Sequence, residues 1–304
     1  MDALQSNRRQ FLKLFGTAAV IGSVAPDLLA QSRKAVSITI LHTNDVHSRL
    51  DPFPIDGGRN AGRGGVARRA TLLKSIREQE KNVLLFDAGD IFQGTPYFNL
   101  YKGEPEILAM NQLNYDAGTL GNHDFDGGID NMVTQFGKAK FPMLIANYDF
   151  KNTVMDGKTQ PSKIFEKDGV RIGVFGVGIK PDGLIPKEAY KETRYLDPIE
   201  IGNDMAARLR NENKCDYVIC LSHLGFKYDG PTVSDNVLAA KTRNIDLIIG
   251  GHTHTFLDAP VAVNNLDTKP VWINQVGFAG INLGRIDLNF DSGKATVKGQ
   301  SIGV

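Results

Sequence analysis

Five short segments of this sequence place histidine near glycine, asparagine or aspartate, each after a run of apolar residues. The densest segment, residues 121–126, contains an amide, an imidazole and two carboxylates, namely Asn122, His123, Asp124 and Asp126. The chain leaves the preceding apolar strand through a glycine turn, so these side chains are expected at that strand's carboxyl edge. Open α/β sheets bind their ligands at this edge. Imidazole, amide and carboxylate groups placed there can bind metal ions and transfer protons.

The histidines are concentrated on one kind of turn. The chain has six of them, and five follow directly on predicted buried strands. A single histidine in such a place is more often a structural residue, whereas five on the same kind of turn indicate a shared site. These five are His47, His123, His223, His252 and His254. The sixth, His42, lies within a predicted strand, and we expect it in the core or behind the site.

Two of the turns carry pairs of residues that can chelate a divalent cation. Zn²⁺, Mn²⁺ and Fe²⁺ bind imidazole nitrogen together with carboxylate or amide oxygen. Asp45 and His47 are two residues apart on an extended segment, so their side chains point the same way and can hold one ion. His252 and His254 have the same spacing. The sequence therefore predicts two pairs of metal ligands, separated by about two hundred residues of sequence.

Asp90, Asn122 and His223 complete a set that suits two ions. Metals about 3.5–4 Å apart repel each other, and a carboxylate shared between them screens that repulsion. Asp90 follows a glycine on the middle strand of the group and is the natural bridge. Asn122 offers a neutral oxygen, and His223 a further nitrogen. A lone carboxylate or amide in such a place usually caps a helix or lies in a surface loop, but these come with a histidine or a glycine turn.

The order of apolar patterns favours a two-sheet α/β fold. Helices are predicted over residues 66–80, 104–113, 129–138, 200–213 and 233–242. Strands are predicted over residues 36–41, 83–86, 117–120, 141–146, 163–167, 171–177, 217–221, 247–249, 271–276 and 281–290. Strand–helix alternation favours parallel pairing with helices outside, while an Asp-Gly hairpin and the last strands add antiparallel pairs. We therefore predict a four-layer αββα sandwich of two mixed sheets flanked by helices, in a single domain over residues 31–304.

The first thirty residues resemble a twin-arginine export signal. Arg8 and Arg9 precede a modestly apolar run over residues 14–25, and cleavage is expected after Ala30. A spanning helix needs about twenty apolar residues, and a proline interrupts this run too early. The sequence therefore predicts export to the periplasm, with a retained N-terminal membrane anchor as the alternative.

Net charge and cysteine positions argue against a nucleic-acid partner, an anionic membrane partner and a disulfide. A formal net charge of +1 gives no indication of nucleic acid or an anionic membrane surface as a partner. Cys215 and Cys220 lie on a predicted strand and its approach, five residues apart, so their side chains point to opposite faces. We expect them to pack in the core rather than to form a disulfide.

Together the five turns resemble the signature blocks of the calcineurin-like metallophosphoesterases. The blocks are Asp45-x-His47, Gly89-Asp90, Gly121-Asn122-His123-Asp124, Ser222-His223 and Gly251-His252-x-His254. Longer segments, residues 41–47, 89–96 and 121–126, resemble the catalytic domain of the periplasmic 5′-nucleotidase family. The resemblance covers residues 37 to about 290.

The resemblance implies roles for individual residues. It assigns one metal to Asp45, His47, Asp90 and His254. It assigns the second metal to Asp90, Asn122, His223 and His252. His123 is then a charged or proton-donating group beside the phosphoryl oxygens, not a ligand, and Asp126 orients it. Some members of the family carry glutamine at the position of His254, where histidine is the stronger ligand for zinc-like ions.

The resemblance also implies an activity. We expect a phosphoesterase with two divalent metals (Zn, Mn or Fe) that hydrolyses phosphate monoesters, nucleotides above all, through a metal-bridging hydroxide. The alternatives are a cyclic nucleotide phosphodiesterase, another anionic ester hydrolase, or a non-enzymatic metal-binding module that acts with a separate partner. Full-length family members carry a C-terminal domain that clamps the nucleoside, whereas this sequence stops at Val304. We expect either a separately encoded polypeptide to supply that domain or recognition mainly through the phosphate.

Overall fold

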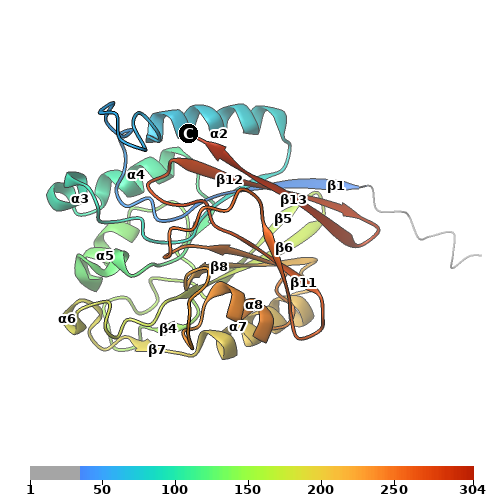
Figure 1. Cartoon of the computed structure of the whole chain (residues 1–304). Helices are drawn as coiled ribbons and strands as arrows, with labels where there is room; N and C mark the ends of the chain where they lie inside the picture. The colour runs from blue at the N-terminus through green and yellow to red at the C-terminus, as the bar shows by residue number, and fades with distance from the viewer. Residues whose placement is uncertain (1–34) are drawn as a thin grey trace, which may run out of the picture. The chain divides into compact units, whose positions relative to one another are not determined.

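Two mixed β-sheets packed face to face form the centre of the fold, and helices cover their outer faces (Figure 1). The computed structural model describes residues 35–304. The predicted export signal, residues 1–30, lies outside the described residues and stays a prediction. Among the helices that are described, none is long and apolar enough to cross a membrane.

The first sheet has five strands in the order β13-β12-β1-β2-β3. Its strands are β1 (Val36–Thr43), β2 (Val83–Asp87), β3 (Ala117–Gly118), β12 (Asn282–Asp291) and β13 (Lys294–Gly303). The strands β1, β2 and β3 are parallel, and β12 returns antiparallel to β1. The carboxyl ends of the three parallel strands therefore meet at one edge of the sheet.

The second sheet has six strands in the order β10-β11-β9-β8-β6-β5. Its strands are β5 (Ser162–Lys167), β6 (Val170–Gly178), β8 (Tyr217–His223), β9 (Leu247–Gly250), β10 (Val261–Asn264) and β11 (Pro270–Asn274). The four central strands run parallel, and β5 and β10 pair antiparallel at the edges. A small separate sheet joins β4 (Tyr148–Asp149) to β7 (Arg194–Tyr195).

The alternation of side chains along the central strands produces the layers. On β1, Ile38 and Ile40 face the second sheet, whereas Leu41 faces the helices. On β8, Ile219 faces the first sheet and Cys220 faces outward. Successive residues of a strand point to opposite faces, so a strand buried on both sides is apolar throughout. The apolar layer between the sheets and one outer layer on each side confirm the predicted αββα sandwich.

The helices supply the two outer layers. They are α2 (Val66–Gln79), α3 (Pro96–Tyr101), α4 (Glu104–Gln112), α5 (Gly128–Phe136), α6 (Lys187–Tyr190), α7 (Pro198–Ala207) and α8 (Asp235–Lys241). Helices α2, α4 and α5 contribute apolar side chains to the layer over the first sheet, and α7 and α8 to the layer over the second. Figure 1 shows α2 and α4 on one side of the paired sheets and α7 and α8 on the other.

One predicted strand, residues 141–146, is wrong. The segment makes only isolated bridges, Gly118 with Met143 and Leu144 with Gln160. It runs between β3 of the first sheet and β6 of the second, because Leu144 N donates to Gly118 O at 2.7 Å and Ala146 N donates to Gly176 O at 2.9 Å. Gly176 allows this approach, since a Cβ there would collide with the carbonyl of Leu144. A segment shared between two sheets cannot continue a ladder with either.

Other predicted elements differ in smaller ways. The predicted helix over residues 200–213 becomes α7 followed by a π-helical turn, Arg208–Glu212. The strand predicted over residues 217–221 extends two residues further, so His223 is the last residue of β8. The strands β10 and β13 and the short helices α3 and α6 were not predicted. Cys215 and Cys220 are buried and free, as the sequence predicted.

His42 belongs to the core. It is fully buried, and its Nε2 lies 3.0 Å from Asn274 Nδ2 on the second sheet. Burial lowers the pKa of His42 to about 3, so its ring is neutral. The neutral ring can accept the amide hydrogen of Asn274 and join the two sheets where they face each other.

Candidate metal centre

The candidate site is built from turns with unusual backbone conformation. Five of the predicted ligands have a left-handed backbone, with φ of 52° at Asp45, 52° at His47, 56° at Asp90, 74° at His252 and 51° at His254. Residues other than glycine rarely adopt this region, which costs about 1–3 kcal/mol each. Each turn leaves the carboxyl end of a parallel strand and bends sharply. Strain gathered at one edge of two sheets marks that edge as a functional site.

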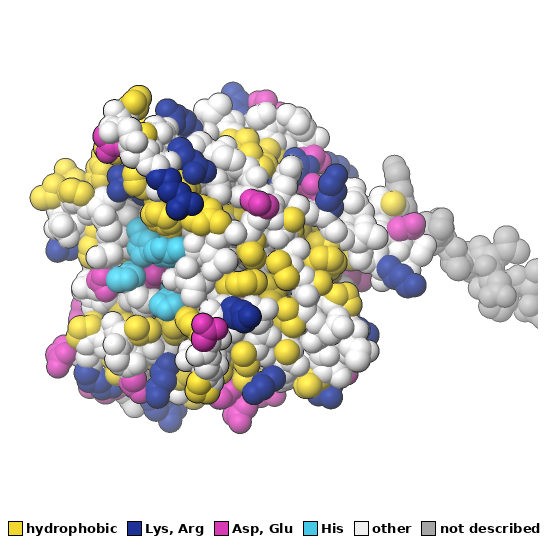
Figure 2. Space-filling model, in the orientation of Figure 1, with side chains coloured by type: hydrophobic (Ala, Val, Ile, Leu, Met, Phe, Trp, Pro, Cys, Tyr) yellow, Lys and Arg dark blue, Asp and Glu magenta, His cyan; other side chains and the backbone are white. Residues whose placement is uncertain are grey.

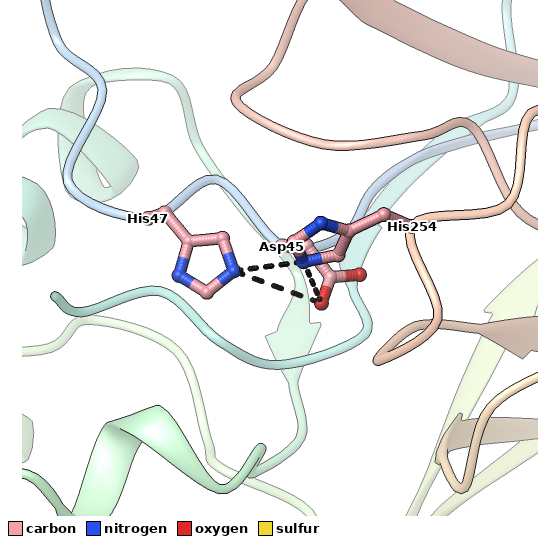
Figure 3. Close-up of side chains that lie close together, drawn as sticks. All are labelled: Asp45, His47 and His254. Carbon is pink, nitrogen blue, oxygen red and sulfur yellow. Dashed lines mark hydrogen bonds and ion pairs between the residues drawn. The ribbon is translucent and has the colours of Figure 1, made fainter. Parts of the chain in front are cut away.

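Asp45, His47 and His254 form the first ligand group (Figure 3). Their ligand atoms all lie within 4.8 Å of one another. His47 Nε2 and His254 Nε2 are 3.0 Å apart, and His254 Nε2 is 3.3 Å from Asp45 Oδ1. Ligand atoms on one tetrahedral zinc ion lie about 3.3 Å apart, given metal–nitrogen distances of about 2.0–2.1 Å. The group therefore fits a cation.

Asp90, His223 and His252 form the second group. His223 is fully buried; its Nδ1 lies 2.7 Å from the carbonyl of Ala88, which fixes a proton on that nitrogen. Its Nε2 makes no hydrogen bond within residues 35–304 and lies 3.1 Å from Asp90 Oδ2. Asn122 joins this group, because its Oδ1 is 2.7 Å from His252 Nδ1. A buried, unpartnered imidazole nitrogen facing a carboxylate suits a metal ion.

Asp90 lies between the two groups. Its Oδ2 is 3.1 Å from His223 Nε2 and 3.8 Å from His47 Nε2. Burial alone would raise the pKa of Asp90, but His223, followed by His47, holds it below its usual value. The carboxylate is therefore ionised, and a metal ion on either side could bind it. The bridging role predicted for Asp90 stays a prediction.

The first and last turns of the site are joined through Asp45. The backbone N–H of His252 donates to both carboxylate oxygens of Asp45 at 3.0 Å. Asn44 Nδ2 donates to Asp45 Oδ2 at 2.6 Å and to Gly277 O at 2.7 Å. Residues 207 positions apart in sequence thus share one hydrogen-bonded cluster. The seven predicted ligands come together, and their assignment to particular ions stays a prediction.

The site attracts positive charge. Burial lowers the pKa of His223, but the charges of Asp90 and Asp45 outweigh burial and raise it to about 10. His252 is held by burial at a pKa of about 4. A cluster that raises the pKa of a fully buried imidazole stabilises a cation at that point. A metal ion would take the place of that proton, since ligand binding requires the neutral ring.

Asp124 holds two turns of the site together, a role that the sequence did not reveal. Its buried carboxylate accepts backbone N–H groups of Asp90, Ile91, Phe92 and Gly121 at 3.1, 2.9, 3.2 and 2.8 Å. It therefore holds the turn that carries Asp90 against the turn that carries Asn122. Burial, followed by the charge of Asp90, raises the pKa of Asp124 to about 7. Only its position three residues after a glycine turn hinted at this role.

His123 and Asp126 lie beside the ligand groups. His123 Nδ1 is 2.9 Å from Asp126 Oδ2, and the His123 side chain is 38% exposed. The His123 ring is 5.3 Å from that of His47, yet His123 belongs to neither ligand group. The hydrogen bond to Asp126 raises the pKa of His123. An imidazole that keeps its proton beside a metal centre is suited to acid catalysis.

Replacing Asp124 with Asn is expected to weaken metal binding by about 10–100-fold, the usual effect of losing a residue that positions ligands. An amide offers one acceptor oxygen, and its NH₂ group would face backbone N–H donors. Competitive titration with a chelator, with metal content measured on the same samples, tests this. Asp130→Asn is the matched control, because Asp130 is an exposed carboxylate that pairs with Lys191. Unchanged metal affinity in Asp124→Asn would contradict a positioning role.

Comparisons with known proteins agree with this geometry. The sequence matches the family of calcineurin-like phosphoesterases over residues 38–256. It is 36% identical over 282 residues to a snake venom 5′-nucleotidase of Naja atra, an alignment that covers 86% of this chain and 52% of that protein. It is 36% identical over 278 residues to a 5′-nucleotidase of Homo sapiens, covering 84% of this chain and 47% of that one.

Solved structures give the same result. The fold matches a 5′-nucleotidase precursor from Thermus thermophilus with a TM-score of 0.78 and 30% identity, over 88% of this chain and 55% of that one. It matches a calcineurin-like phosphoesterase from Bacillus subtilis with a TM-score of 0.68 and 27% identity, over 88% of this chain and 91% of that one. The chain spans about half the length of the curated 5′-nucleotidases it matches. By sequence and by fold, it belongs to the calcineurin-like phosphoesterase family.

Proposed function

We propose that this chain hydrolyses phosphate monoesters with the help of two divalent metal ions, and that its substrates are nucleoside 5′-monophosphates. The observation that carries the proposal is the placement of Asp90 between two groups of ligands. Two groups that share a carboxylate form the arrangement required by a pair of ions. The substrate class is supported by relatives that are named 5′-nucleotidases.

The two ligand groups define what the ions would do. One ion would be held by Asp45, His47 and His254. The other would be held by Asn122, His223 and His252, and Asp90 would bind both ions. When bound, such ions supply a hydroxide at neutral pH and neutralise charge on the phosphoryl oxygens. Nearby side chains must then place the substrate and protonate its leaving group.

His123 is the proton donor in this proposal. Its Nε2 would carry the transferred proton, because Nδ1 is engaged with Asp126 Oδ2. The backbone N–H of His123 donates to Asp90 Oδ1 at 2.8 Å, which fixes the residue relative to the ligand groups. A protonated imidazole here can stabilise a developing oxyanion and donate a proton to the leaving alkoxide.

The experiment that tests the proposal is turnover of the purified chain. Phosphate release from AMP and p-nitrophenyl phosphate, and conversion of cyclic AMP to AMP, are measured together with metal content on the same sample. We expect two metals per chain and preference for AMP over cyclic AMP. Preference for cyclic AMP would indicate a phosphodiesterase. Bound metal without turnover of any ester would indicate a metal-binding module instead of an enzyme.

His123→Ala is expected to retain both metals and to lose hydrolysis by a factor of about 10²–10⁴, the usual contribution of acid–base catalysis. Metal analysis and AMP turnover on one preparation separate the two effects. A variant that lost a metal ion would show that His123 is itself a ligand, contrary to the proposed role.

Asp126→Asn is expected to move the alkaline limit of activity to lower pH. His123 donates a proton only while it is protonated, and Asp126 raises its pKa, so the pair stays active to higher pH. Without the carboxylate, the imidazole loses its proton at lower pH. The measurement is kcat for AMP as a function of pH, with Asp130→Asn as a carboxylate control. An unchanged alkaline limb would exclude His123 as the titrating acid.

A further inference from the structure

Three phenylalanines form a continuous surface beside the first ligand group. Phe278 stacks on the ring of His254, with centroids 5.2 Å apart and an interplanar angle of 13°. Phe53 and Phe256 both meet Phe278 edge to face, at centroid distances of 6.5 and 6.1 Å. We call Phe53, Phe256 and Phe278 the aromatic shelf. It begins at a predicted metal ligand and extends away from it.

The aromatic shelf is open to solvent. Phe256 is 44% exposed, whereas most large apolar side chains of the described chain are buried. Phe53 and Phe278 are half-buried. Figure 2 shows hydrophobic side chains next to the histidines on the same face of the molecule. Leaving this much aromatic surface in water is unfavourable, and an exposed apolar patch at a site is a feature of ligand binding.

The shelf is held in place before any ligand arrives. The loop that carries Phe278 is bonded to the first turn of the site, because Ala279 N donates to Asp45 O at 2.7 Å. Gly277 N donates to Thr255 O at 2.9 Å, which fixes the neighbourhood of Phe256. A surface that is already ordered costs a ligand little entropy on binding.

A positive charge lies at the far end of the shelf. The guanidinium carbon of Arg49 is 4.3 Å from the centre of the Phe53 ring, in cation–π geometry. Arg49 also lines a small cavity of about 320 Å³ with Tyr97 and Tyr101. Flat aromatic faces bordered by arginine bind planar, electron-rich rings such as nucleobases.

We infer that the aromatic shelf binds the organic part of the substrate and selects phosphate esters whose leaving group carries a planar ring. The inference rests on the proposed function, since the phosphate would lie at the ligand groups beside His254. A nucleobase would stack on Phe256 and Phe278. A small aliphatic leaving group has no surface to place there, so it gains nothing from the shelf.

The test compares two substrates in Phe256→Ala. The quantity measured is the ratio of kcat/KM for AMP to kcat/KM for glycerol 2-phosphate. We expect this ratio to fall about tenfold, the order of one aromatic stacking contact, and to be restored in Phe256→Trp. Leu266→Ala, which removes a similarly exposed apolar side chain on the turn between β10 and β11, should leave the ratio unchanged. An unchanged ratio in Phe256→Ala would overturn the inference.

A binding measurement separates this inference from the proposed function. Adenosine binding to the metal-loaded chain is followed by ligand-observed NMR, and we expect Phe256→Ala to raise its Kd about tenfold. If Phe256→Ala weakened adenosine binding but the unsubstituted chain hydrolysed no ester, the shelf would be supported and the proposed function refuted. If the chain hydrolysed AMP but Phe256→Ala bound adenosine as well as the unsubstituted chain does, the proposed function would be supported and the shelf refuted.

Discussion

The structure depends on three carboxylates buried at the meeting point of two sheets. Asp45, Asp90 and Asp124 are each at most 1% exposed. Moving charged groups out of water costs several kcal/mol each unless partners compensate. Asp124 is compensated by four backbone N–H donors, and Asp45 partly by the N–H of His252. Asp90 accepts few such hydrogen bonds and faces imidazole rings, so a cation would compensate its buried charge.

The backbone around these carboxylates shows what the fold must provide. Left-handed turns at five ligands are unfavourable in isolation, and they persist because rigid parallel strands hold both ends of each turn. Gly121 illustrates how tight the arrangement is, since a Cβ there would collide with the carboxylate of Asp90. The layered core therefore serves the site directly, by keeping the carboxyl ends of five strands, β1, β2, β3, β8 and β9, close together.

The residues of the candidate metal centre could be predicted from the sequence because their signal is local. Asp45, Asp90 and His254 each follow an apolar run and a turn, and the end of a parallel strand fixes where such residues point. The clamp formed by Asp124 and the stacking of Phe278 on His254 were not predicted. Both depend on contacts between segments far apart in sequence, which no periodicity records. The strand order was out of reach for the same reason, because β1 pairs with β12 near the end of the chain.

Edge strands and shared segments gave the weakest signals. The strand β13 has one exposed face and a polar, glycine-containing sequence, so its pattern resembles a loop. Residues 141–146 have the opposite problem: they are apolar enough for a strand, but they bond to both sheets in turn. In each case tertiary context, not local preference, decides the backbone.

A row of rings connects the proposed proton donor to the aromatic shelf. His123 contacts His47 at 5.3 Å, His47 contacts His254 at 5.0 Å, and His254 contacts Phe278 at 5.2 Å, all between ring centres. Burial lowers the pKa of His47, whereas Asp126 raises that of His123, so of these two rings His123 holds a proton more readily. A leaving group that receives this proton and also reaches Phe278 must extend past the intervening rings. The proposed proton donor and the aromatic shelf therefore lie on either side of His47 and His254, two predicted ligands of one ion.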